Sequence, residues 1–351
     1  MNLKVLTRSY VIAACLLGGL LSCSTVAYSA PITDFEQGWV DGHVHIVDFF
    51  QEGESLEKLI ASMDKHEIHS AMITGIAVKK KWADSEPERP IYYQSDASPL
   101  YWFSATDHLV AKQVERLNAA QRKRLYPFIT GFNPTDLDSV SEIKMLLELY
   151  PQFWQGIGEV FTRHDDLSML TEGEVARADH PAMLKIYKLA AKHDLPVLLH
   201  SNVSSKRDKE SLYLPELKAA LKAAPKTRFI WAHAGASGTL HRWQKHDDLH
   251  KLLERLLKRY PNLSIDLSWC VLEPYILKKG KPKQVWLDLI NTFPDRFVLG
   301  SDVVGKYDNQ GNILKEFEPL LDALDAPARQ GLKHRNFRRL LPKWSPGYLK
   351  N

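Results

Sequence analysis

Eight short apolar segments alternate with amphipathic helical segments along this chain, and the alternation predicts an α/β fold, a (β/α)8 barrel of the TIM type. The apolar segments are rich in Val, Ile, Leu and aromatic residues, and they lack the polar alternation of a strand with one wet face. Strands of this kind are buried on both faces in parallel sheets that helices cover. Eight such units favour closure of the sheet into a barrel.

The elements follow one another regularly. The predicted strands end near Val44, Thr74, Gly131, Val160, His200, His233, Leu267 and Gly300. The predicted helices span Leu56 to His66, Val140 to Leu149, Pro181 to His193, Leu214 to Ala223, Asp247 to Tyr260, Gln284 to Asn291 and Ala326 to Leu340. Proline in the first turn supports the helix start at Pro181, because that turn needs no backbone donor from this residue.

A long aromatic-rich insertion follows the second predicted strand. Between Lys79 and Arg124 it holds six large aromatic residues, namely Trp82, Tyr92, Tyr93, Tyr101, Trp102 and Phe103. A loop of this length in a compact domain usually serves a function. Two interpretations remain open: a lid over the C-terminal face of the barrel, or an insertion that packs on its outer helices.

The N-terminal segment is typical of an export signal. Lys4 and Arg8 precede the apolar run 11–21, which is shorter than the roughly 20 residues that a membrane-spanning helix needs. We therefore predict a signal peptide over residues 1–29 and a single barrel domain over residues 30–351, in an exported, periplasmic protein.

Two processing sites compete within this segment. Ala27 and Ser29 form a small-residue pattern that ordinary signal peptidase accepts, with cleavage after Ser29. Leu20 to Cys23 instead resembles a bacterial lipobox, in which Cys23 is lipidated and tethers the protein to a membrane. Both alternatives remain open, and in both the protein is exported.

Composition narrows the function classes. The net charge is +4, from 46 basic and 42 acidic residues, and the short basic clusters are scattered, so we expect no nucleic-acid partner. A hydrophobic fraction of 44% with 25% charged residues is that of a globular protein. Cys270 is alone in the body of the chain, so no disulfide within the domain is expected.

Side chains that can bind metal gather at the ends of the predicted strands. His43 and His45 are two residues apart on the first strand, so both point to the same face. The other candidates stand at or just past the ends of the fourth, fifth, sixth and eighth strands: Glu159, His200, His233 and Asp302. Barrel enzymes keep their active sites at this face. Imidazoles and carboxylates without sulfur suit zinc or a similar divalent ion.

These residues and the phrases around them resemble the amidohydrolase superfamily, in particular its amidohydrolase-related branch of metal-dependent hydrolases. The matching phrases are Asp41 to His45, Gly156-Ile-Gly-Glu159, Pro196-Val-Leu-Leu-His-Ser201, Ala232-His-Ala-Gly235, Gly300-Ser-Asp302 and Asn336-Phe-Arg-Arg-Leu-Leu-Pro342. The resemblance extends from about Trp39 to Leu341 and implies a metal-dependent barrel enzyme that acts on a small molecule.

The resemblance implies one or two metal ions. With one ion, His43, His45, His200 and Asp302 hold it, and His233 contacts the reacting water or the substrate. With two ions, Glu159 bridges them, while His200 and His233 hold the second. The alternative for Glu159 is an ion pair with Arg163 or a helix cap.

The resemblance also implies the roles of the catalytic residues. Asp302 would accept a proton from the attacking water and pass it to the leaving group, and His233 would stabilise the developing oxyanion. Candidates for lining the substrate pocket are Trp154, Arg163, Asn202 and Trp269.

The reaction itself stays open at this point. The leading hypothesis is an exported hydrolase of an amide, ester or lactone bond. The alternatives are a metal-dependent decarboxylase of an aromatic or unsaturated acid and a metal-binding lipoprotein without catalytic activity.

Overall fold

The computed structural model describes residues 38–80, 100–206, 208, 210–243 and 246–349. The described residues all belong to one compact unit. The predicted signal peptide, Cys23 and the cleavage site after Ser29 lie outside the described residues, so the signal peptide, the lipidation and the single domain over residues 30–351 stay predictions.

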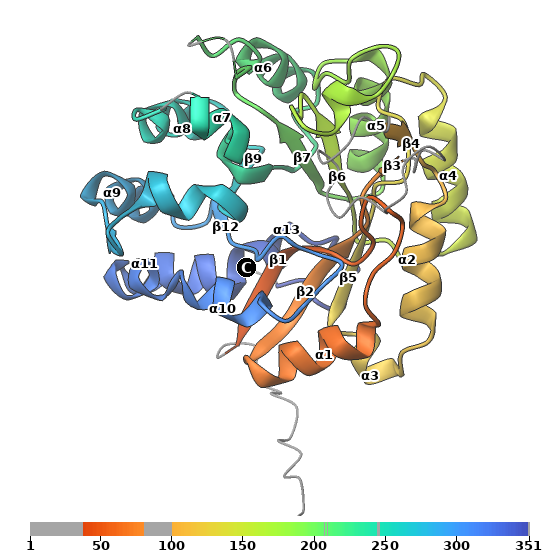
Figure 1. Ribbon diagram of the computed structural model, residues 1–351, viewed down its shortest axis with the longest axis horizontal. Coiled ribbons are helices and arrows are strands. Elements are labelled where there is room, and N and C mark those ends of the chain that lie inside the picture. The colour runs from red at the N-terminus through yellow and green to blue at the C-terminus, as the bar shows by residue number, and fades with distance from the viewer. Residues whose placement is uncertain (1–37, 81–99, 207, 209, 244–245, 350–351) are drawn as a thin grey trace, which may run out of the picture. The chain divides into compact units, whose positions relative to one another are not determined.

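Nine parallel strands form one sheet, which curls into the predicted α/β barrel (Figure 1). The strands are β1 (Trp39–His45), β2 (Ile68–Thr74), β5 (Leu125–Ile129), β6 (Gly156–Thr162), β7 (Val197–Ser201), β8 (Phe229–Trp231), β9 (Leu263–Asp266), β12 (Phe297–Val298) and β13 (Val303–Val304). Their order is β12-β9-β8-β7-β6-β5-β2-β1-β13. They occupy the positions of the eight strands that the sequence predicts, since β12 and β13 together make the eighth.

The eighth strand is interrupted at Leu299–Asp302. On one side of the break β12 pairs with β9, and on the other β13 pairs with β1. Backbone hydrogen bonds from Gly42 to Leu299 (2.9 Å) and from Asp302 to His43 (2.8 Å) tie the break to β1. The break therefore holds Asp302 directly beside the two histidines of the first strand.

A small apolar cluster fills the barrel interior below the strand ends. It draws residues from the strands and from the C-terminal segment: Val40, Met72, Tyr126, Phe128, Leu198, Ile230, Ala232, Val298, Phe337 and Leu341. Leu198 in this cluster and His200 are two residues apart on β7, so both face the interior. The cluster thus forms the floor on which the polar strand ends lie.

Helices surround the sheet, and the predicted ones lie close to their predicted bounds. They are α1 (Leu56–Lys65), α4 (Ser139–Leu149), α5 (Pro181–Lys192), α6 (Leu214–Ala223), α8 (Leu249–Arg259) and α9 (Gln284–Thr292). The predicted last helix is a run of α12 (Ala326–Gln330), a π-helical turn (Gly331–Arg335) and α13 (Asn336–Leu340). Three helices of six residues each were not predicted from the sequence: α7 (Gly238–Trp243), α10 (Gln310–Lys315) and α11 (Glu318–Ala323).

The described part of the insertion contains regular structure. An antiparallel pair, β3 (Val78–Lys80) and β4 (Leu100–Trp102), leads to α2 (Thr106–Glu115) and α3 (Ala119–Arg122). The pair packs in an apolar cluster with Phe161, whose ring stacks on His45 at 6.2 Å between centroids. The base of the insertion therefore adjoins the candidate site. Trp82, Tyr92 and Tyr93 lie outside the described residues, and the choice between lid and packed insertion stays a prediction.

None of the described helices has both the length and the apolar character that crossing a bilayer requires.

Candidate metal centre

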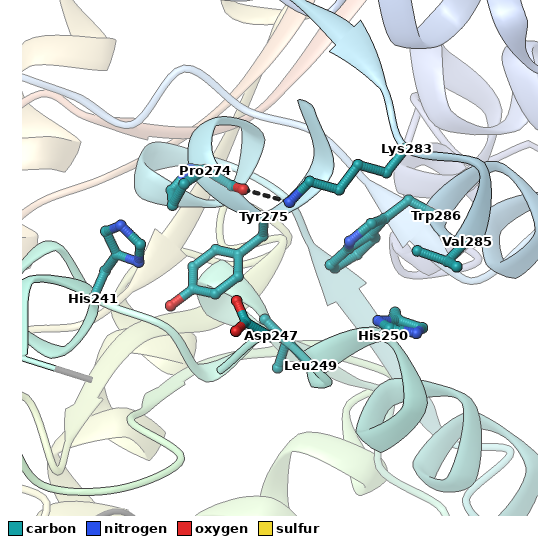
Figure 2. A pocket seen from close by; sticks show the side chains of 9 residues that line it. All are labelled: His241, Asp247, Leu249, His250, Pro274, Tyr275, Lys283, Val285 and Trp286. Atoms are coloured by element: carbon teal, nitrogen blue, oxygen red, sulfur yellow. Dashed lines mark hydrogen bonds between the residues drawn. The ribbon is translucent and has the colours of Figure 1, made fainter. Parts of the chain in front are cut away.

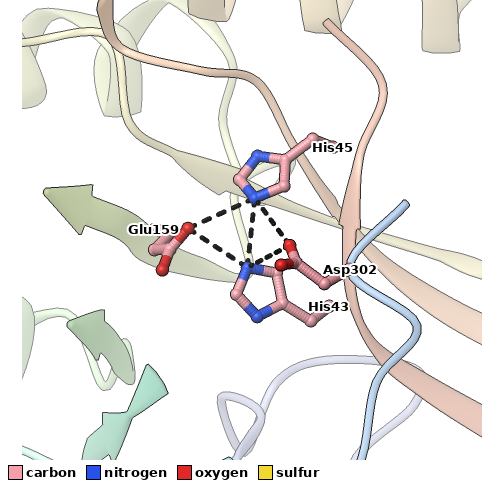
Figure 3. A group of neighbouring side chains, drawn as sticks. All are labelled: His43, His45, Glu159 and Asp302. Atoms are coloured by element: carbon pink, nitrogen blue, oxygen red, sulfur yellow. Dashed lines mark hydrogen bonds and ion pairs between the residues drawn. The ribbon is translucent and has the colours of Figure 1, made fainter. Parts of the chain in front are cut away.

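Four of the predicted strand-end residues meet at one point. His43 and His45 from β1, Glu159 from β6 and Asp302 from the β12–β13 break point toward one another (Figure 3). The two Nε2 atoms are 3.1 Å apart. Glu159 Oε2 lies 3.3 Å from Nε2 of His43 and 3.2 Å from Nε2 of His45, and Asp302 Oδ1 lies 3.5 and 3.3 Å from the same two atoms.

These spacings fit one divalent cation. An ion with tetrahedral ligands at about 2.0 to 2.2 Å keeps those ligands about 3.3 to 3.6 Å from one another. The five separations of 3.1 to 3.5 Å between the four donor atoms are close to this range. His43, His45 and Glu159 are buried, whereas the Asp302 side chain is 12% exposed, so Asp302 faces the open side of the centre.

A second group of donors shares Glu159. Its other oxygen, Oε1, lies 2.9 Å from Nδ1 of His200 and 3.3 Å from Nε2 of His233. His200 therefore groups with Glu159 and His233. The other group of donors consists of His43, His45, Glu159 and Asp302. This grouping matches the two-ion alternative, in which one carboxylate stands between two sets of ligands.

The far nitrogen of two rings contacts an acceptor that fixes the ring. His45 donates from Nδ1 to the backbone oxygen of Gly75 at 2.9 Å, which leaves Nε2 as its donor atom toward the centre. His200 Nε2 lies 3.0 Å from Oδ1 of Asn202, whose Nδ2 donates to Asp165. Because Asn202 is held in this orientation by Asp165, its oxygen faces His200, and Nδ1 of His200 points toward Glu159.

The end of β9 supplies two polar residues that were not among the sequence-based candidates. Asp266 Oδ2 lies 3.0 Å from Nδ1 of His43, and Ser268 Oγ lies 3.0 Å from Nδ1 of His233. The available signal was a carboxylate at the end of the predicted seventh strand, at the face where barrels keep functional residues. Its histidine partner lies on another strand, so the sequence contains the carboxylate but does not indicate which histidine it contacts.

Mutual attraction within the centre overrides the effect of burial. Burial lowers the pKa of His45, but hydrogen bonds with Asp302 and Glu159 raise it to about 9. Burial raises the pKa of Glu159, yet the His43 charge and hydrogen bonds from His200 and His233 bring it well below its ordinary value. The pKa of Asp302 is lowered as well, against burial, mainly by His43. The two carboxylates thus attract positive charge, which protons or a divalent cation can supply.

The four predicted pocket residues have different surroundings. Trp154 precedes the first residue of β6, lies fully buried and lines a pocket between α4 and α5. Arg163 pairs with Glu216 and lies 4.3 Å over the Tyr213 ring, so the alternative ion pair with Glu159 does not form.

Asn202 and Trp269 do lie at the centre. Asn202 contacts His200 as described above. Trp269 is 39% exposed, and its ring meets the His233 ring edge-on at 5.1 Å between centroids. Of the four candidates, Trp269 is exposed beside the predicted metal-binding residues, whereas Asn202 is buried with 1% of its surface exposed.

A separate pocket of about 240 Å³ lies between the start of α8 and helix α9 (Figure 2). Tyr275, Lys283 and Trp286 line it, and Lys283 donates to the backbone oxygen of Pro274 at 2.7 Å. None of the six predicted metal-binding residues contributes to it. The candidate metal centre is therefore identified by its cluster of nitrogen and carboxylate donors, and this pocket is a separate feature.

Comparison with known proteins agrees with this fold. An uncharacterised TIM-barrel protein from Bordetella bronchiseptica is 13% identical with a TM-score of 0.54, over 86% of this chain and 98% of that one. A protein described as an amidohydrolase II is 16% identical with a TM-score of 0.52, over 86% and 99%. At these identities the likeness shows the fold alone. No curated protein matches the sequence.

The sequence profile of the amidohydrolase family matches residues 161–343, which is 183 of the 351 residues. The match includes His200, His233 and Asp302, three of the six predicted metal-binding residues. The chain belongs to the amidohydrolase family, within the superfamily of metal-dependent barrels that its strand-end motifs resemble.

Proposed function

We propose that the protein is an exported hydrolase that holds two divalent ions, most suitably zinc, and cleaves an amide, ester or lactone bond of a small molecule. The observation that carries this proposal is the position of Glu159. One of its oxygens faces His43 and His45, and the other faces His200 and His233. A carboxylate that turns one oxygen to each of two imidazole pairs has the arrangement of a bridge between two ions.

The residues present fit this metal. His43, His45 and Asp302 would hold one ion, His200 and His233 the other, and Glu159 both. Nitrogen and carboxylate donors without thiolate are suited to zinc. When bound, divalent ions of this kind supply activation of water near neutral pH and polarisation of a substrate carbonyl.

Side chains of the protein would transfer the proton and bound the substrate site. Asp302 is the most exposed of the candidate ligands, and its carboxylate can accept a proton from the attacking water and return it to the leaving group. Trp269 is exposed beside the His233 ring and would bound the substrate there. On this proposal His233 is a ligand; with a single ion it would be free to stabilise the oxyanion.

The number of ions can be counted directly. Metal-free protein titrated with zinc should saturate at two equivalents, and Glu159→Gln should take up one or fewer, because the amide nitrogen cannot bind an ion. Glu216→Gln is the matched control, since Glu216 is a carboxylate that pairs with Arg163 away from the centre. A wild type that saturates at one equivalent contradicts the two-ion proposal.

A substrate panel tests the reaction class. Amides, esters, lactones and aromatic acids are incubated with the loaded protein, and the products are analysed. Hydrolysis that is lost in Glu159→Gln and kept in Glu216→Gln supports the proposal. Release of carbon dioxide without hydrolysis would favour the decarboxylase, and inactivity on the whole panel with full metal content would favour the non-catalytic lipoprotein.

For localisation we propose export to the periplasm through residues 1–29, with a membrane tether if Cys23 is lipidated. The proposal is supported by the basic and apolar layout of the N-terminal segment.

A further inference from the structure

Two buried residues at the end of β9 lie behind one ring from each half of the metal centre. Asp266 and Ser268 are both fully buried. The rings of His43 and His233 stack almost in parallel, 5.2 Å apart at 11°, with the Nδ1 atom of each close to the Ser268 hydroxyl. The opposite nitrogens both face Glu159, each at 3.3 Å. Each ring therefore lies between Glu159 in front and the β9 residues behind.

We propose that Asp266, acting directly on His43 and through Ser268 on His233, is a single positioning group shared by both halves of the centre. It keeps the Nδ1 atom of both rings protonated and so leaves Nε2 of each ring free to bind a cation. This inference rests on the two-ion function proposed above.

The directions of the hydrogen bonds follow from what each group can do. A carboxylate oxygen only accepts, so Oδ2 of Asp266 accepts hydrogen bonds from Nδ1 of His43 at 3.0 Å and from the Ser268 hydroxyl at 2.6 Å. The hydroxyl has one proton, which it uses to donate to Asp266, so its oxygen accepts the hydrogen bond from His233 Nδ1 at 3.0 Å. The backbone oxygen of Ser268, 3.3 Å from the same Nδ1, is a second acceptor there.

The second oxygen of Asp266 holds the carboxylate in place. Oδ1 accepts from the backbone nitrogen of Ser268 at 3.0 Å. Both oxygens are thus used, and an amide in this position would have to turn its NH2 group toward either Ser268 N or His43 Nδ1. Asp266→Asn therefore disturbs the arrangement with almost no change of volume.

Metal affinity distinguishes positioning from a purely structural role. The variants Asp266→Asn and Ser268→Ala are compared with Thr227→Val, which removes one buried hydroxyl bond, to the Tyr187 backbone oxygen, outside the centre. Zinc affinities of the folded proteins are measured for each equivalent by competition with a chelator, and cobalt spectra report the coordination. Loss of groups behind a metal-binding histidine typically weakens binding about 10- to 100-fold.

We expect Asp266→Asn to weaken both equivalents by about 10- to 100-fold and Ser268→Ala to weaken chiefly one, with an altered cobalt spectrum in each. Thr227→Val should lower the melting temperature without changing either affinity. Unchanged affinities in folded Asp266→Asn would overturn the inference. If that variant does not fold, Ser268→Ala decides, and unchanged affinities there overturn it equally.

The two proposals fail in different ways. A wild type that binds one ion overturns the two-ion function and with it the shared role of Asp266. A wild type that binds two ions while the β9 variants bind them normally leaves the proposed function intact and removes only this inference.

Discussion

Asp107 on α2 holds the end of β5 by two backbone contacts, and its environment predicts an unusual dependence of stability on pH. The carboxylate accepts from the nitrogens of Thr130 and Gly131, both at 2.9 Å, and it is completely buried. Burial raises its pKa from 3.8 to about 7, and the two backbone hydrogen bonds only partly oppose this. Thr130 in turn donates to the backbone oxygen of Glu159 at 2.5 Å, so this contact also supports the candidate metal centre.

The sign of the effect follows from the raised pKa. Between about pH 4 and pH 7 the folded protein binds a proton at Asp107 that the unfolded chain does not, so the carboxyl stabilises the fold at low pH and this stability is lost as the pH rises through about 7. Each pH unit over which only the folded protein holds this proton lowers the unfolding free energy by about 1.4 kcal/mol, so the loss between pH 5 and pH 8 is about 3 kcal/mol. Asp107→Asn has no carboxyl at this position and therefore lacks this pH dependence.

Urea unfolding of wild type and Asp107→Asn at pH 5 and pH 8 measures this difference. The stability of wild type relative to the variant should fall by about 3 kcal/mol from the lower to the higher pH. Comparing the two proteins removes the contribution of histidines, which both contain. A difference that stays constant with pH would refute the reasoning, because it would mean that the two N–H donors keep Asp107 ionised throughout.

Two further predictions follow from individual contacts and one from the N-terminal sequence. Asn202→Leu should weaken the second metal equivalent about 10- to 100-fold and spare the first in a zinc titration, because His200 loses the acceptor at Nε2. Arg163→Gln should cost about 1 to 2 kcal/mol of unfolding free energy without raising KM, since its partners are Glu216 and Tyr213; a raised KM at unchanged stability would restore it as a substrate residue. Cys23→Ser should release the protein from the membrane fraction if the lipobox functions, whereas soluble wild-type protein beginning at Ala30 would show ordinary cleavage.

The fold was largely predictable because each barrel unit carries its signal locally. The apolar runs from β1 to β9 and the periodic faces of helices such as α5 and α6 lie within single stretches of sequence. The elements that were not predicted have weak signals in the local sequence. Helices α10 and α11 are too short for a clear period, and the split of the eighth strand at Leu299–Asp302 depends on hydrogen bonds to β1.

The candidate site was predictable as a set of residues but not as an arrangement. The rule that barrel enzymes place functional side chains at strand ends selects the six metal-binding candidates. Trp154 does not obey this rule, because it stands before its strand instead of after it and therefore lies at the other end. Arg163 does follow the end of its strand, but its side chain forms an ion pair with Glu216 on α6. Nothing near Arg163 in the sequence indicates that partner.

The contacts that orient the four histidines could not be predicted from the sequence. Each imidazole of the centre faces Glu159 with one nitrogen and an acceptor with the other: Gly75 beyond β2 for His45, Asn202 beyond β7 for His200, and the end of β9 for His43 and His233. Three of these four acceptors come from a different strand than the histidine they orient. The direction of each candidate metal-binding nitrogen is therefore a property of how the strands are placed around the barrel, because the acceptor behind each ring fixes which nitrogen faces Glu159.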